Sequence, residues 1–444
     1  MLFAVAAAFC LLQAPAPDPA DAYFERGLRM ASTGHTSAAI GQFEMATRLR
    51  PGFADAWLNL GALYQASGEL ESARDALLKA LSAKPGHTEA MNALGLVEEQ
   101  RRHPAEAARL LERVLEQRPD YLEARHNLAV ALIASGNSRR AVNELQRVVR
   151  AKQGWAAPYF TLARAHERLG NTRAAIESFR TALRLEPRSA SGHFHLGELL
   201  ARNSQAAESI AEFRRAVELE SENASYRYAL ARGLQATGKQ EAARAEFARI
   251  REITARARSA EQAGAENAAA IALARQGKLQ EAAAGFGRAI KLNPSLAEAH
   301  YNLAGVLLKS GDSVRAKSEF ERAIELAGDF VDARSELAAM LAEADQWQAA
   351  AEQLRNAVEL RPGRLDLRYR LVEALQQTGD HHAVIRELSE CALLDPNNAA
   401  LHYNLGVAFL VGLRDRRRAA EEFERALAIR PDYPEARNAL AASR

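Results

Sequence analysis

The chain has 444 residues, with 58 Lys and Arg against 56 Asp and Glu, and aromatic residues make up only 6% of it. Because the two signs of charge are nearly balanced and interspersed, no long-range field favours nucleic acid or an anionic membrane. A chain of this length would ordinarily suggest several domains, but a repeating array grows along one axis, so its length counts repeats instead. We therefore expect no nucleic-acid partner.

The first residues are predicted to be an export signal. Residues 1–12 are almost entirely apolar, and a proline-rich stretch follows over 13–19. The apolar run is shorter than the roughly 20 residues of a membrane-spanning helix, so we expect residues 1–16 to be a signal peptide and the mature protein to be periplasmic or secreted. No Lys or Arg precedes the run, which leaves a different start site or an unconventional membrane-directing segment open as alternatives.

The two cysteines add little to this prediction. We do not expect a lipid on Cys10, because the bulky Phe9 precedes it where a small residue is usual. Cleavage near residue 16 leaves Cys391 alone, and one thiol cannot form an internal disulfide.

Prolines recur with a period of 34 residues or a multiple of it. The spacing is 34 from Pro51 to Pro85, from Pro85 to Pro119, and from Pro362 to Pro396. A fixed period of this length is typical of stacked helical hairpins, none of which can bury its apolar face alone. Proline ends a unit because it lacks an amide donor and disfavours helix in the residue before it.

The residues between the prolines fall into columns. One unit contains the pattern W-x2-L-G-x2-Y, then A, then P, formed by Trp57, Leu60, Gly61, Tyr64, Ala73 and Pro85. This pattern resembles the tetratricopeptide repeat family from about residue 20 to the end of the chain. The resemblance implies an all-α, right-handed superhelical solenoid of about twelve helix-turn-helix repeats with a C-terminal capping helix.

Two irregularities divide the array. Five extra residues enter between the seventh and eighth repeats, which adds about 7.5 Å if they are helical. We therefore predict repeats 1–7 over 20–255, an extended helix or hinge at 256–262, repeats 8–12 over 263–433, and a capping helix over 434–444. A single further residue is inserted around 411–418.

The sequence gives no sign of catalytic chemistry. It contains no H-E-x-x-H, P-loop, C-x-x-C or G-x-S-x-G motif. His193 and His195 are two residues apart on a predicted helix, so they point to different faces and make poor metal ligands. We expect no catalytic residues, no metal site, no cofactor and no enzymatic activity.

The family resemblance implies that the first helix of each repeat lines a concave wall that binds peptides. One column of these helices is aromatic in seven of twelve repeats. With arginines one and two turns further along, it predicts a peptide-binding groove for an extended, acidic ligand, formed by Phe160, Arg164, Arg168, Phe194, Arg202, Tyr228, Arg232 and Arg275. The alternative interpretation is that the rings only cover neighbouring helices and that Glu167 and Glu198 neutralise the arginines.

The next column contains four asparagines, Asn59, Asn127, Asn302 and Asn404. It resembles the asparagine ladder of O-linked sugar transferases, in which such side chains hold a peptide backbone. Only four of twelve repeats keep this residue, so a continuous ladder is not expected, but the four asparagines are included in the predicted peptide-binding set.

Together these features predict a non-enzymatic scaffold or adaptor that binds other proteins or extended peptides and has no membrane span after signal cleavage. One alternative is the substrate-recognition subunit of a separately encoded enzyme such as a glycosyltransferase. Another is a structural component of a secretion or exopolysaccharide apparatus. The sequence does not determine the oligomeric state.

Overall fold

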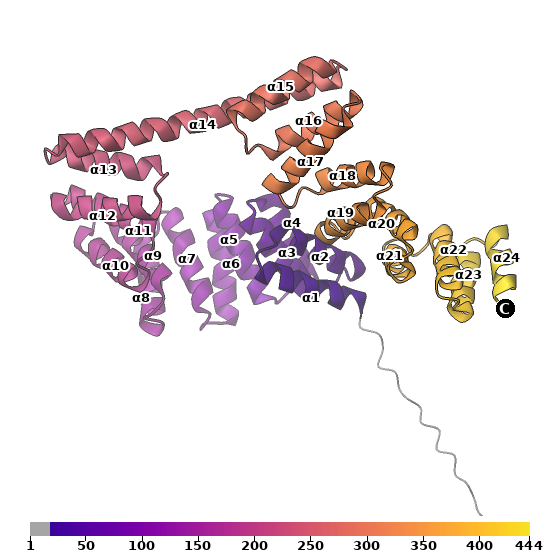
Figure 1. Ribbon diagram of the computed structural model, residues 1–444. Coiled ribbons are helices and arrows are strands. Elements are labelled where there is room, and N and C mark those ends of the chain that lie inside the picture. Colours follow the sequence, from indigo (N-terminus) through magenta and orange to yellow (C-terminus); the bar gives the residue numbers. More distant parts are fainter. Residues whose placement is uncertain (1–17) are drawn as a thin grey trace, which may run out of the picture.

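The computed structural model describes residues 18–444, in which every regular element is helical (Figure 1). The predicted export signal at 1–16 lies outside the described residues. Among the helices at 18–444, none combines the length and the apolar character needed to cross a membrane.

The helices pair into twelve hairpins in chain order. Repeats 1–6 comprise α1 (Pro19–Ser32), α2 (Thr36–Leu49), α3 (Ala54–Ala66), α4 (Leu70–Ala83), α5 (Thr88–Gln100), α6 (Pro104–Gln117), α7 (Leu122–Ala134), α8 (Ser138–Ala151), α9 (Ala156–Arg168), α10 (Thr172–Leu185), α11 (Ala190–Arg202) and α12 (Ala206–Leu219). Repeats 7–12 and the terminal helix comprise α13 (Ala224–Ala236), α14 (Gln240–Arg275), α15 (Leu279–Leu292), α16 (Ala297–Lys309), α17 (Ser313–Leu326), α18 (Val331–Glu343), α19 (Trp347–Leu360), α20 (Leu365–Thr378), α21 (His381–Leu394), α22 (Ala399–Val407), α23 (Arg416–Ile429) and α24 (Pro434–Ser443).

Small residues allow the two helices of a hairpin to pack closely. A Cβ on Gly61 in α3 would stand 2.7 Å from Cγ of Leu77 in α4, and one on Gly197 in α11 would stand 2.7 Å from the ring of Phe213 in α12. Separations this short are not tolerated between carbon atoms, so the small column predicted from the sequence is required by packing.

The extra residues between repeats 7 and 8 lie inside one continuous helix. α14 spans 36 residues and serves both as the second helix of repeat 7 and as the first helix of repeat 8. Figure 1 shows it as a long rod that joins the two halves of the array. Packing against α13 near one end and α15 near the other fixes the direction in which the second half departs.

The inserted residue near the C-terminus forms a π-helical turn. The turn covers Ala408–Gly412 between α22 and α23 and is followed by Arg414 in the left-handed region, with φ 55°. A π-turn is the usual way in which a helix accommodates one extra residue. Asp415 then starts α23 by accepting a hydrogen bond from the amide of Arg418.

The array closes on itself, because repeat 1 packs against repeats 10 and 11. α2 contacts α19, and Tyr23 of α1 is 1% exposed beneath α20 and α21, where its hydroxyl donates to Glu390 and accepts from Arg368. Gln42 donates to the carbonyl of Glu359 at 3.3 Å. In Figure 1, α1 and α2 accordingly lie beside α19–α21, and repeat 12 continues past the junction. The sequence did not predict this ring.

A second feature absent from the sequence prediction is a repeated polar contact, here called the corner contact. A side chain near the start of a first helix binds the carbonyl six residues earlier and a residue on the second helix. His300, for example, contacts the Pro294 carbonyl at 3.2 Å and Glu319 at 2.6 Å. The same arrangement recurs with the pairs Arg125–Glu144, His193–Glu212, Arg227–Glu246, Arg368–Glu387 and His402–Glu422. It satisfies the corner carbonyl and ties together the two helices of those hairpins in which it occurs.

Candidate functional site: an aromatic and basic hollow on the inner wall

The first helices form the inner wall of the solenoid. Successive first helices contact one another, as α3 does α5, α5 does α7, and α11 does α13. Because helices on the inside of a curve approach more closely than those on the outside, these contacts place the predicted binding column on the concave side.

Four of the predicted site residues meet in one hollow between α11 and α13. It has a volume of about 800 Å³ and is lined by Phe194 and Arg202 from α11 and by Tyr228 and Arg232 from α13. Glu198 lines the same hollow. The hollow therefore combines aromatic faces with two guanidinium groups and one carboxylate, which suits an extended peptide with apolar and acidic side chains.

Tyr228 stands out from the other aromatic residues of its column. Its side chain is 53% exposed, although its ring also meets Phe247 edge-on at 6.1 Å. An exposed tyrosine offers a large contact area with little loss of side-chain freedom on binding. Tyr228 is therefore the ring of the hollow that is most available for contact.

Most of the other aromatic residues in the column pack against the next repeat. Phe194 lies 4.8 Å from Tyr226, Tyr301 lies 4.8 Å from Phe330, and both distances join ring centroids. Burial raises the pKa of Tyr226, and the negative charge of Glu220 raises it further by a smaller amount. For these rings, the contacts support the alternative interpretation, in which the rings cover neighbouring helices. Tyr369, 39% exposed, is the other solvent-facing ring of the column.

The predicted arginines differ in their partners. Arg202 pairs with Glu167 at 2.9 Å, across neighbouring first helices. Within residues 18–444, no ion pair is formed by Arg164, Arg168, Arg232 or Arg275. Arg232 is thus the guanidinium in the hollow that has no carboxylate partner in the described chain, and a ligand carboxylate could bind it without displacing an existing contact.

The remaining predicted residues lie outside this hollow. Phe160, Arg164 and Arg168 lie on α9, one repeat earlier, and do not line it. Arg275 and Asn302 line a separate hollow of about 410 Å³ between the end of α14 and α16. The structure therefore divides the predicted groove into at least two places.

The asparagine column is largely occupied by contacts within the chain. Asn127 donates to the side-chain oxygen of Asn92 at 3.0 Å, and Asn302 donates in the same way to Asn267 at 3.2 Å. Asn59 donates to the Asp55 carbonyl of its own helix at 2.8 Å. Asn404 is exposed. The amides of Asn127 and Asn302 connect neighbouring first helices. The role of all four asparagines toward a peptide stays a prediction.

The floor of the hollow is made of small residues that were not among the predicted site residues. Ala201, Ala229, Gly233 and Ala236 line it, and Ile250 of α14 closes one side. The signal was present in the sequence as small residues one turn apart in a single first helix, α13, at Ala229, Gly233 and Ala236. With no large side chain at these positions, the backbone is accessible to a ligand.

One cluster of titratable groups lies outside the hollow. Glu98, His103 and Glu106 are close enough for a metal ion, but the 1% exposed Glu98 already accepts hydrogen bonds from Arg74 and Arg101 and contacts His103. The net effect of these partners is to lower the pKa of Glu98 against the opposing effect of burial. Two guanidinium groups already neutralise this carboxylate, so the cluster is an ion-pair network.

Models of the tetratricopeptide repeat match residues 24–88, 100–165, 160–224 and 306–364, and a TPR repeat model matches 272–311. Helical hairpins stacked with an inner wall of first helices define an all-α solenoid. The chain belongs to the tetratricopeptide repeat family. A comparison with curated protein sequences found no match.

Several solved structures are similar to parts of the chain. PilF of Pseudomonas aeruginosa is 19% identical, with a TM-score of 0.41, and the match covers 45% of this chain and 91% of PilF. YrrB, described as a TPR protein with an unusual peptide-binding site, is 22% identical, with a TM-score of 0.33 and coverage of 51% and 96%. PilW, described as a type IV pilus biogenesis factor, is 20% identical, with a TM-score of 0.44 and coverage of 48% and 98%.

Proposed function

We propose that this protein is a non-enzymatic scaffold that binds an extended segment of another protein in the hollow between α11 and α13. The observation that supports this most is the exposed Tyr228 beside Arg232, above a floor of small residues. The proposal includes export of the mature chain, so we expect its partners among proteins of the cell envelope or the medium.

The binding mode follows from the lining. An apolar or aromatic side chain of the ligand stacks on Tyr228 and Phe194, while its main chain lies over the small residues of the floor. A carboxylate of the ligand pairs with Arg232, and Glu198 disfavours a second acidic group close by. The ligand is therefore a mixed apolar and acidic segment instead of a continuous acidic run.

Charge reversal tests this proposal. A variant with Arg202→Glu and Arg232→Glu should lose the partner that the wild-type protein captures from native envelope extract. The matched control carries Arg164→Glu and Arg168→Glu, the same change of charge on α9 outside the hollow. Equal loss in both variants, or in neither, would show that the hollow is not the binding site.

A further inference from the structure

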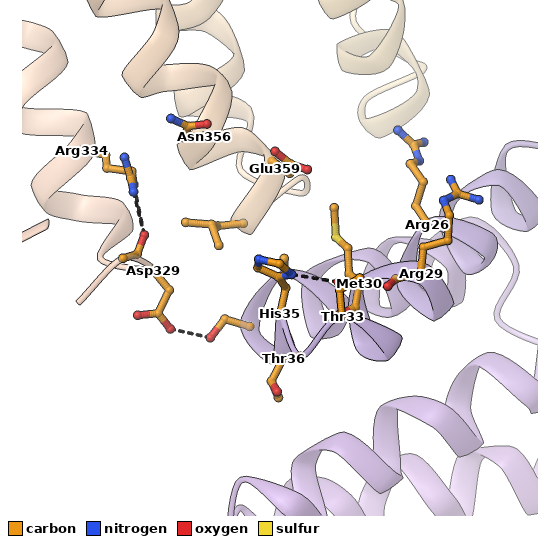
Figure 2. A pocket seen from close by; sticks show the side chains of 15 residues that line it. Arg26, Arg29, Met30, Thr33, His35, Thr36, Asp329, Arg334, Asn356 and Glu359 are labelled. Atoms are coloured by element: carbon orange, nitrogen blue, oxygen red, sulfur yellow. Dashed lines mark hydrogen bonds between the residues drawn. The ribbon is translucent and has the colours of Figure 1, made fainter. Parts of the chain in front are cut away.

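A cavity lies where the ring closes. It has a volume of about 990 Å³ and is lined by the turn between α1 and α2, the corner between α17 and α18, and the side of α19 (Figure 2). Because its walls come from repeat 1 and from repeat 10, the cavity exists only while the two ends of the ring are in contact.

Arg334, at one wall of this cavity, is an exception among the corner contacts. Like its counterparts, it donates to the corner carbonyl, that of Gly328, at 2.8 Å. On the second helix, however, it meets the amide oxygen of Gln353 at 3.0 Å, where the other corner contacts have a glutamate. Among the corner contacts of residues 18–444, Arg334 is thus the cation without a carboxylate.

Burial makes this missing partner costly. Arg334 is partly buried, and burial lowers the pKa of its guanidinium group. A charge removed from water is stable only when paired or fully hydrogen-bonded, so an anion supplied from outside the chain would stabilise this side chain.

Two more arginines face the same cavity from α1. Arg26 and Arg29 line it, and neither forms an ion pair within residues 18–444. Figure 2 shows them on the side of the cavity opposite Arg334, with Asn356 and Glu359 between the two groups. Two separated groups of guanidinium donors suit a ligand with more than one anionic group.

The lining also contains two carboxylates. Asp329 accepts a hydrogen bond from the hydroxyl of Ser37 at 2.7 Å, which holds it across the closure. Glu359 lines the cavity from α19. Three guanidinium groups therefore face two carboxylates, and apolar contact is offered by Met30 and Leu360.

We propose that this cavity is a second binding site, distinct from the hollow at α11 and α13, and that it takes an acidic peptide segment whose carboxylates pair with Arg334 and with Arg26 and Arg29. The size of the cavity fits a short peptide better than a single small anion. Since both ends of the ring contribute to the site, the ligand binds the closed ring and stabilises it.

The test measures fluorescence anisotropy of labelled hexaglutamate at low salt. The main variant is Gln353→Glu, which gives Arg334 the partner that its counterparts have and should weaken binding by about tenfold. It should also raise the thermal midpoint, so the loss of binding cannot come from unfolding. Gln280→Glu, on the exposed face of α15, is the control with the same change of charge.

Four further results decide the proposal. A Cβ at Gly41 would stand 2.8 Å from the main-chain oxygen of Leu360, so Gly41→Leu should open the ring and abolish the Gln353-dependent binding. Equal affinity of the wild-type protein and Gln353→Glu for hexaglutamate would overturn the proposal, as would no binding by the wild-type protein. If pyrophosphate binds with the same dependence on Gln353 and hexaglutamate does not, the site takes a small anion and the peptide assignment is wrong.

Discussion

The helical residue Gly41 lies against the main-chain oxygen of Leu360, and a Cβ at position 41 would stand only 2.8 Å from that oxygen. It would also stand 2.8 Å from Cδ of Pro362. Glycine inside a helix is about 0.5–1 kcal/mol less favourable than alanine. The closure of the ring accounts for a residue that otherwise weakens α2.

Gly41→Ala should therefore open the ring although it favours the helix. We expect a larger radius of gyration in small-angle scattering, with unchanged helical content by circular dichroism. Gly305→Ala in α16 is the control, because a Cβ there meets nothing within 4 Å. An unchanged radius of gyration in Gly41→Ala would contradict the closed ring as the solution state.

Loss of a corner glutamate should destabilise the array. Arg125 and Glu144 are paired with side-chain exposures of 14% and 12%. Glu144→Ala leaves a largely buried guanidinium group unpaired, which should lower the free energy of unfolding by about 3 kcal/mol.

The control for this prediction is an exposed pair. Arg322 and Glu325 are 47% and 66% exposed, so Glu325→Ala should change the free energy of unfolding by less than about 1 kcal/mol. Urea denaturation of both variants measures the difference. Equal effects would mean that the corner contact adds no more than an ordinary surface ion pair.

His126 should make stability depend on pH. Burial lowers the pKa of His126 to about 4, with a small opposing effect from Glu123, and its ring contacts the Thr161 hydroxyl at 2.8 Å. Between pH 6.5 and 4 the unfolded chain binds a proton at this position that the folded chain does not. The stability that the neutral ring contributes is therefore present above pH 6.5 and lost as the pH falls toward 4, by up to about 3 kcal/mol.

Denaturation midpoints at pH 7 and pH 4.5 measure this effect. His126→Gln should lose less stability on acidification than the wild-type protein, since glutamine does not titrate. His382→Gln, at an exposed histidine, controls for the loss of one titratable group. The same pH dependence in His126→Gln and in the wild-type protein would show that His126 is not the responsible group.

The sequence predicted the features that each repeat carries within itself. The proline period, the small columns and the helical pairing arise from residues at most one repeat apart, so they leave a periodic signal. The closure of the ring depends on Tyr23 meeting Arg368 and Glu390, more than 340 residues along the chain. Such a contact depends on the summed curvature of all the repeats that lie between the two residues. A pattern within one repeat does not predict that sum.

The candidate site could be predicted in part for the same reason. The columns identified Phe194, Arg202, Tyr228 and Arg232 because they repeat at fixed spacing, and the structure brings these four together. The columns did not distinguish exposed rings from packed ones, because that depends on the residue opposite, such as Tyr226 beside Phe194. The columns did not single out Arg334 either. This residue differs from the other corner residues because it meets Gln353, and not a glutamate, on the second helix.

The central claim, that the hollow at α11 and α13 binds the partner, is tested most directly by one pair of tyrosines. Tyr228 and Tyr369 belong to the same column and are 53% and 39% exposed, but only Tyr228 lines the hollow. Affinity capture from native envelope extract should lose a specific partner with Tyr228→Ala and keep it with Tyr369→Ala. Equal capture by the two variants would contradict the claim and move the binding site elsewhere on the solenoid.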